Sequence, residues 1–134
     1  MDWKLELVAV PVTDVDRAKR FYGEQVGFVV DHDTWVSDEM RVVQLTPHGS
    51  ACSIALGVGI GAAAPGSVQG LQLVVSDIEA ARAELIERGV KVSEVQRLDP
   101  RMGEPSCSSV IRTATAGRYR RSAPAPDATA RTAC

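Results

Sequence analysis

Two histidines are the residues of this chain best suited to proton transfer. His32 lies in the run Asp31-His32-Asp33, and His48 lies in a Pro-His-Gly sequence that is typical of a turn. Histidine titrates near neutral pH, so either could carry a proton, although histidines at turns and on surfaces commonly have no such role. Because neighbouring residues of a strand point to opposite faces, we do not expect Asp31, His32 and Asp33 to share a metal ion.

The three cysteines are further candidates for metal binding, disulfide formation or nucleophilic catalysis. Cys52, Cys107 and Cys134 lack metal-site spacing, and no disulfide framework is expected. Cys52 alternates with Ile54 and is interpreted as a small core residue rather than a nucleophile.

A ligand cup could be lined by three large side chains. Trp3, Trp35 and Met40 are the candidates, with His32 as a polar partner. Ordinary core or dimer contacts are an equal alternative for them. No catalytic residue is assigned.

Four acidic residues stand where helix N-termini are expected: Asp14, Asp16, Asp77 and Glu79. A carboxylate at such a position accepts hydrogen bonds from free backbone N–H groups and stabilises the helix dipole. We interpret the four as caps and dipole partners, not as catalytic acids.

The elements that must position these residues follow from hydrophobic periodicity. The first half predicts a strand over 5–12, a helix from Thr13 or Asp14 that ends at Gly27, and strands over 28–32, 40–46 and 51–57. After a Gly- and Ala-rich connection over 58–66, the second half predicts a strand over 71–75, a helix over 78–88 that ends at Gly89, and a strand over 90–98.

The two halves contain an internal repeat. Val12-Thr13-Asp14-Val15-Asp16-Arg17-Ala18 recurs as Val75-Ser76-Asp77-Ile78-Glu79-Ala80-Ala81 after about 63 residues, a length typical of a supersecondary module used twice. On these segments, with Phe21-Tyr22 and Val26-Gly27-Phe28, the chain resembles the vicinal oxygen chelate superfamily of glyoxalases, bleomycin-resistance proteins and extradiol dioxygenases. The resemblance covers roughly residues 4–100 and implies an α+β fold of paired βαβββ modules.

The resemblance also implies where a metal would bind. Metal-dependent members use His and Glu on the first and last strand of each module, and these positions are Leu7, Ala55 and Gly70 here. None of these side chains can bind a metal, and the fourth position lies beyond the repeat. We expect no cofactor, and a divalent metal only at a site unlike that of the family.

The repeat stops near Arg101. We predict a glyoxalase-like domain over 1–100, with module one over about 4–58 and module two from about 68 lacking its last two strands. Residues 101–134 show neither helical nor strand periodicity and are interpreted as an aberrant tail, mobile or ordered only by a partner chain.

A shifted reading frame would explain the tail. New codons can be built from the third base of each residue's codon and the first two bases of the next codon. From Arg101 this reading permits Asp-Gly-Gly-Thr-Phe and then Val-Phe-Phe-Ser-Asp-Pro-Asp-Gly-Asn. Near Ser122 it permits Gln-Glu-Ile. That string is how the family typically ends. We hypothesise that one base was lost near the Arg101 codon; permissive codons and a native disordered extension are the alternatives.

Composition narrows the function classes. Hydrophobic residues make up 45% and charged residues 24%, and the net charge of −2 gives no reason to expect nucleic acid as a partner. The longest apolar run is too short to span a bilayer, no signal peptide is evident, and the cytoplasm is the expected location.

Taken together, these features predict a binder of small apolar or aromatic ligands, which the resemblance implies is a homodimer. A glyoxalase-like lyase, isomerase or dioxygenase with a divergent site is one alternative. The impaired product of a frameshifted gene is another.

Overall fold

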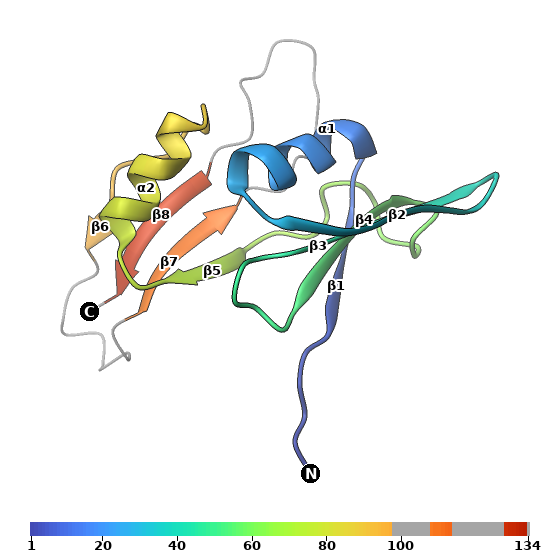
Figure 1. Ribbon diagram of the computed structural model, residues 1–134, viewed down its shortest axis with the longest axis horizontal. Helices are drawn as coiled ribbons and strands as arrows, with labels where there is room; N and C mark the ends of the chain where they lie inside the picture. Colours follow the sequence, from blue (N-terminus) through green and yellow to red (C-terminus); the bar gives the residue numbers. More distant parts are fainter. Residues whose placement is uncertain (98–107, 114–127, 134) are drawn as a thin grey trace. The chain divides into compact units, whose positions relative to one another are not determined.

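The computed structural model describes residues 1–97, 108–113 and 128–133, with side chains over residues 1–95. The chain divides into two compact units, an N-terminal unit over Met1–Val68 and a C-terminal unit that begins at Gln69. Each unit contains a four-stranded sheet and a helical segment (Figure 1). The α+β class expected from the sequence is confirmed.

The N-terminal unit runs strand, helix and three strands. Its elements are β1 (Leu7–Pro11), α1 (Val15–Arg20), η1 (Phe21–Val26), a π-helical continuation of α1, β2 (Val29–Ser37), β3 (Met40–Thr46) and β4 (Ser53–Val58). The sheet order is β1-β4-β3-β2, in which β1 is parallel to β4 and the other neighbours are antiparallel.

The helix of this unit begins and ends as the sequence predicts. The Asp14 carboxylate accepts a hydrogen bond from the Arg17 N–H at 2.9 Å, which satisfies a free donor of the first turn. At the other end Gly27 has a φ of 90°, and the Phe28 N–H donates to the Tyr22 carbonyl at 2.8 Å. A left-handed glycine of this kind closes the helix.

The core of the N-terminal unit lies between this helix and one face of its sheet, the helix face. Val10, Val43, Leu45 and Leu56 are fully buried there, and a Cβ placed on Gly23 of η1 would lie 3.8 Å from Leu45 Cδ2. In the described part of this unit, no helix covers the opposite face, which we call the open face.

The C-terminal unit has the same number of strands in a different order. Its elements are β5 (Leu71–Val75), α2 (Ile78–Glu87), β6 (Gln96–Arg97), β7 (Ser108–Thr113) and β8 (Ala128–Ala133). The order is β5-β7-β8-β6, with β7 antiparallel to β5 and to β8, and β6 parallel to β8.

Two expectations for this unit differ from the structure. The strand expected over 90–98 is reduced to β6, because Val90 is buried at the end of α2, where its N–H donates to the Leu85 carbonyl at 2.9 Å.

The second difference is β7 and β8, which lie in the segment where no regular strand was expected. β7 contains the β-branched residues Val110, Ile111 and Thr113, which favour a strand. The other residues of the expected tail, 101–107, 114–127 and 134, lie outside the described residues.

None of the helices in the described residues is long and apolar enough to cross a membrane.

Candidate functional site

A β-bulge in β2 turns two neighbouring polar residues to the open face. Val30 pairs with Leu45 and His32 pairs with Gln44, which leaves Asp31 as an extra residue between them. The Asp31 carboxylate accepts a hydrogen bond from the Thr46 hydroxyl. The expectation that Asp31 and His32 point to opposite faces is therefore wrong, because a bulge interrupts the alternation of the strand.

Asp31 ends a row of hydrogen bonds that crosses three strands of the open face. Gln44 Nε2 donates to Ser53 Oγ at 3.1 Å, and Ser53 Oγ lies 2.7 Å from Thr46 Oγ1, which in turn donates to Asp31. Ser53 is only 5% exposed, so these bonds satisfy a polar group that water does not reach.

Small apolar side chains adjoin this polar row. Ala9 of β1 pairs with Ala55 of β4, and Ala55 pairs with Gln44 of β3. Two residues earlier in each strand, and therefore on the same face, Leu7 pairs with Ser53. The accessible part of the open face thus combines apolar side chains at β1 with a polar border at β3 and β2, while Ser53 and Ala55 of β4 are buried between them.

The positions at which the resemblance places family metal ligands do not fit a metal. Leu7 and Ala55 do share the open face, and Gly70 directly precedes β5 in the other unit. However, hydrocarbon side chains and a glycine supply no donor atom. Among the described residues, no group of three or more His, Cys, Asp or Glu side chains could hold a metal ion.

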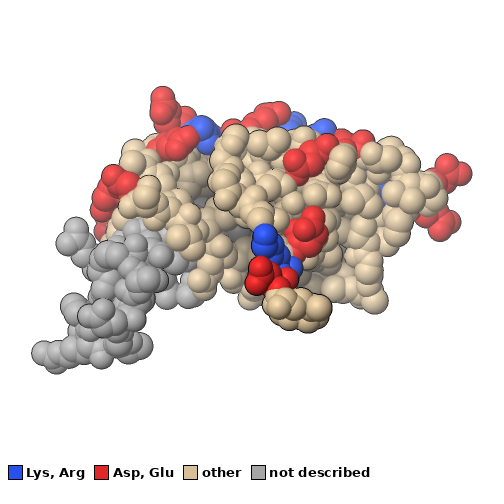
Figure 2. All heavy atoms as spheres, turned by 60° about the horizontal axis from the view of Figure 1, so that its bottom comes forward, with Lys and Arg blue, Asp and Glu red and all other residues tan. Residues whose placement is uncertain are grey.

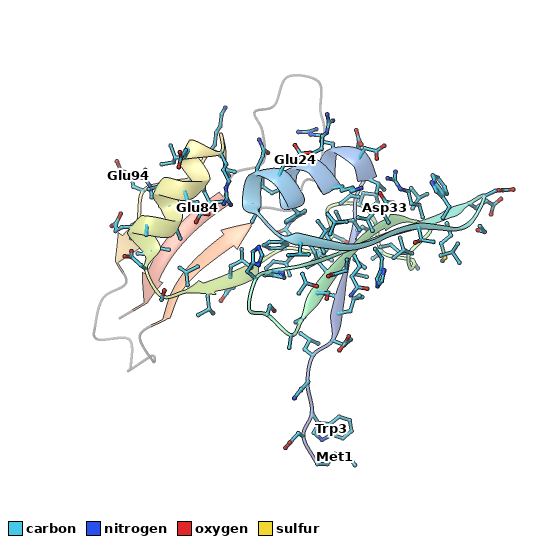
Figure 3. The ribbon with its side chains drawn as sticks, viewed as in Figure 1. Met1, Trp3, Glu24, Asp33, Glu84 and Glu94 are labelled. Atoms are coloured by element: carbon cyan, nitrogen blue, oxygen red, sulfur yellow. The ribbon has the colours of Figure 1, made fainter. Side chains whose placement is uncertain are left out.

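The four predicted ligand-binding residues are not brought together. His32 lies on the open face, and Met40 begins β3 opposite Ser37. Trp35 is 60% exposed and lies on the helix face, with the Arg41 guanidinium 5.8 Å from its ring. Trp3 is 88% exposed on the extended arm that precedes β1, where Figure 3 shows it beside Met1.

Sequence reasoning missed Gln44, Thr46 and Ser53. For Gln44 and Thr46 the signal was present in the alternation of β3, in which Arg41, Val43 and Leu45 point to the helix face and the intervening positions to the open face. Ser53 begins β4, where it is the polar residue of a buried strand.

The helix face carries an ion-pair cluster that attaches α1 to the sheet. Asp33 accepts from Arg41 Nε at 2.9 Å and from Lys19 Nζ at 2.7 Å, while Arg41 also pairs with Asp16 at 2.9 Å. The hydrogen bonds from Arg41 and then Lys19 hold the pKa of Asp33 well below its usual range. The hydrogen bonds that Arg41 donates to Asp33 and Asp16 raise the pKa of Arg41. This cluster is structural, because its charges neutralise one another.

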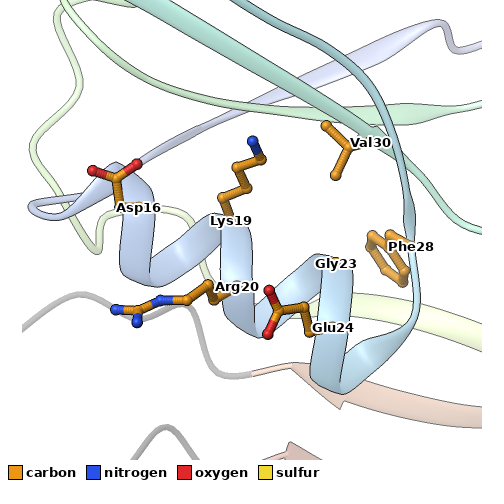
Figure 4. A pocket seen from close by; sticks show the side chains of 7 residues that line it. All are labelled: Asp16, Lys19, Arg20, Gly23, Glu24, Phe28 and Val30. Atoms are coloured by element: carbon orange, nitrogen blue, oxygen red, sulfur yellow. The ribbon is translucent and has the colours of Figure 1, made fainter.

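A hollow of about 620 Å³ lies beside the same helix (Figure 4). Arg20, Glu24 and the paired Lys19 form its charged rim, and Phe28 and Val30 form its apolar side. Two of its charged residues, Asp16 and Lys19, already belong to the ion-pair cluster. The open face therefore remains the stronger candidate.

The remaining polar candidates occupy structural positions. His48 is exposed in a turn in which the Ser50 N–H donates to the Pro47 carbonyl, as predicted. Cys52 is half-buried before β4. On the face drawn in Figure 2, the Lys and Arg side chains of the described residues are few and lie among Asp and Glu rather than in a basic patch.

Comparison with solved structures finds similar folds over nearly the whole chain. TnmS3, an antibiotic-binding protein from Streptomyces sp. CB03234, is 27% identical over 98% of this chain and 97% of its own, with a TM-score of 0.66. A glyoxalase/bleomycin resistance protein from the same organism is 29% identical over 96% and 99%, with a TM-score of 0.65.

A superfamily member from Sphaerobacter thermophilus DSM 20745 is similar in fold, at 22% identity over 98% of each chain and a TM-score of 0.68. No curated protein matches the chain. The family model for the Glyoxalase/Bleomycin resistance protein/Dioxygenase superfamily matches residues 4–100. The chain therefore belongs to this superfamily.

Proposed function

We propose that this protein binds a small apolar or aromatic molecule on the open face and sequesters it without chemical change. The observation that carries the proposal is the composition of that face. Leu7 and Ala9 present exposed apolar side chains on that face, and Ala55 lies buried beside them. Leu7 and Ala55 stand where metal-dependent relatives would have ligands, and a hydrogen-bonded polar row borders this region. A mostly apolar surface with a few fixed polar groups is typical of small-molecule sites.

Similarity to an antibiotic-binding protein supports the same function. TnmS3 is described as a binder of an antibiotic, and its fold matches nearly all of this chain. The side chains at Leu7 and Ala55 support a site without the family metal, because they leave a divalent ion without the nitrogen and oxygen donors that it needs.

The test is a thermal-shift screen of polycyclic aromatic compounds on the full chain, followed by calorimetric titration of any hit. A bound ligand raises the unfolding temperature, because it stabilises the folded state by a free energy that grows with the logarithm of its concentration over Kd. Ala9→Trp should cover this apolar region and weaken binding at least about tenfold. Glu39→Trp adds the same side chain at the β2–β3 turn, and it should leave binding unchanged. Stoichiometric Fe, Mn, Ni or Zn held by His or Glu would contradict the proposal.

A homodimer is also proposed, formed through the arm that precedes β1. Met1, Trp3 and Leu5 are exposed and alternate with Asp2, Lys4 and Glu6, a pattern typical of a strand. The Ser53 N–H already bonds the Glu6 carbonyl at 2.9 Å, and β1 is an edge of its sheet. A strand at the edge of a sheet is a template for a second copy.

The charges of the arm select its register. In an antiparallel pair centred on Lys4, that residue would face its own copy and Asp2 would face Glu6 of the partner subunit, so like charges would oppose each other. A pair centred on Leu5 instead places Lys4 opposite Glu6 of the partner subunit. Opposite charges directly across two strands contribute about 0.2–1 kcal/mol.

Charge reversal tests the dimer and its register. Sedimentation equilibrium should show that Lys4→Glu and Glu6→Lys each weaken association, and that the double variant restores it. Restoration by Asp2→Lys with Lys4→Glu would instead place the centre at Trp3. A monomeric native protein at all concentrations contradicts the dimer.

A reading-frame shift near Arg101 remains a proposal about the gene. It is supported by the alternative reading of the segment from Arg101, and it would make this chain an impaired relative of the intact family. Sequencing the nucleotides decides the matter, because codons that spell an unrelated string in the neighbouring frame rule the shift out.

A further inference from the structure

The hydrogen-bond row on the open face has a defined direction. A hydroxyl group has a single hydrogen, and Thr46 gives its hydrogen to the Asp31 carboxylate. The bond between Ser53 and Thr46 must then be donated by Ser53, whose hydroxyl in turn accepts from Gln44 Nε2. Every hydroxyl hydrogen in the row therefore points toward Asp31.

This direction fixes which groups the row can offer to a bound molecule. Both hydroxyl hydrogens are used within the row, and the remaining carboxylate oxygen of Asp31 and the Gln44 Oε1 are acceptors. For these two atoms, no hydrogen bond is found within the described residues. Gln44 Nε2 keeps a second hydrogen that it can donate, so the demand for a donor is set at Asp31: a ligand group that meets its free carboxylate oxygen must donate.

Charge strengthens the same preference. Among the described residues of the N-terminal sheet, Asp31 and His32 are the titratable groups on the open face. The positive charges of Arg41 and Lys19 lie on the helix face and are paired with Asp33. A protonated amine near Asp31 would gain attraction without competition from these cations, while a carboxylate would be repelled.

The width of the sheet sets the shape of the ligand. Ala9, Ala55, Gln44 and His32 form one row across four strands, and neighbouring strands lie about 4.8 Å apart. The row therefore spans about 14 Å, which matches a flat molecule of two or three fused rings lying across the sheet.

We propose that the open face selects flat apolar molecules that carry a hydroxyl or protonated amine, with the ring body against the exposed Leu7 and Ala9 and the donor on Asp31. This inference rests on the proposed function and names the chemical class that the site would accept. Thr46 acts as a positioning residue, since it fixes the carboxylate through its hydroxyl.

Three probes with one ring system test the inference on the full chain: 2-naphthylmethylamine, 2-naphthol and 2-naphthoate. Fluorescence titration should give the tightest binding for the amine, intermediate binding for the phenol and the weakest for the carboxylate. Asp31→Asn should reduce the preference of amine over carboxylate at least about tenfold. Asp38→Asn, in the exposed β2–β3 turn, makes the same charge change away from this face and should leave it intact.

A second variant keeps the test decisive if Asp31→Asn unfolds. Thr46→Val removes the hydroxyl but keeps the size of the side chain, and it should reduce the preference about threefold while all three probes still bind. Equal binding of the three probes, unchanged by either variant, overturns the inference and leaves the proposed function standing. If none of the probes binds up to millimolar concentration, the proposed function fails, and this inference fails with it.

Discussion

The two units of this protein begin alike and end differently. In each, a strand leads into an aspartate cap, a helix and a left-handed glycine: Asp14 and Gly27 in the first, Asp77 and Gly89 in the second. After that point the first sheet closes as β1-β4-β3-β2, whereas the second is arranged as β5-β7-β8-β6. The repeat is thus retained in the local signals and lost in the pairing of the strands.

The difference shows what each part of the fold depends on. A cap and a terminal glycine act within one helical turn, so a short repeated motif reproduces them. The position of the last strand depends on apolar residues far apart in the sequence. β4 is buried from Ser53 to Gly57 and lies parallel to β1, while β5 has no buried residue and lies antiparallel to β7.

Restoring the neighbouring reading frame should change the difference between the two units most, because it should stabilise the second unit. Insertion of one base at the Arg101 codon would supply apolar strand sequence to the second unit, and the melting temperature should rise by about 10 °C. A rise of this size requires the free energy of unfolding to increase by only several kcal/mol, which additional burial of apolar surface can supply. Calorimetry on both proteins measures it.

The matched control for that experiment inserts two bases, which gives the third frame over the same segment. It should not raise the melting temperature. Equal melting temperatures for all three proteins would show that the segment after Arg101 does not limit the stability of the second unit.

Replacement of one buried leucine by alanine in each unit should show that the core of the first unit is more tightly packed than that of the second. Leu56→Ala, in a strand that is buried along most of its length, should cost about 3–4 kcal/mol. Leu85→Ala should cost about half as much, because β5 of the same unit is partly exposed and the site can relax. Urea unfolding of the two variants checks this, and an equal loss would mean that the second core is as tightly packed as the first.

Much of the fold could be predicted from the sequence because its signals are local. The strand over 40–46 and the strand over 71–75 agree with β3 and β5, and both capping aspartates accept the hydrogen bonds expected of them. The strand predicted over 90–98 is wrong in its extent, since the apolar pattern does not reveal that Val90 closes the helix instead.

The candidate site could be predicted only in part. His32 was identified by its chemistry, but its position beside Asp31 depends on a bulge in the pairing of β2 with β3. Trp35 was identified by its size, yet the register places it opposite Arg41 on the helix face. The register depends on how two strands pair, so it cannot be predicted from the sequence of either strand alone.

The ion-pair cluster gives the first unit a dependence on pH. Because the pKa of Asp33 is lowered in the folded state, the stability that it contributes is fully present above about pH 4 and is lost as the pH falls below that value. Asp33→Asn should remove this part of the acid sensitivity and cost roughly 1–2 kcal/mol at neutral pH.

Chemical unfolding between pH 2 and pH 7 measures the effect. Asp38→Asn, an exposed aspartate in the β2–β3 turn, provides the charge control and should leave the profile unchanged. If the two variants give the same profile, Arg41 and Lys19 do not stabilise the folded carboxylate of Asp33.

The two caps should show the smallest difference. Asp77 accepts from the N–H groups of Glu79 and Ala80, both at 3.0 Å, whereas Asp14 accepts from one. Replacement of either by alanine should cost about 1 kcal/mol. Since α1 is also attached to its sheet by Lys19 and Asp33, the loss at Asp14 should open its helix less than the loss at Asp77 opens α2.

Amide hydrogen exchange at the first turn of each helix separates the two cases. The exchange rate should rise more at Ala80 in Asp77→Ala than at Arg17 in Asp14→Ala, and aspartate-to-asparagine variants should preserve protection because the amide oxygen still accepts. Equal opening of both helices would show that the cap, and not the ion-pair cluster, holds α1 in place. The two helices, which share a capping sequence, would then also depend on their caps to the same degree.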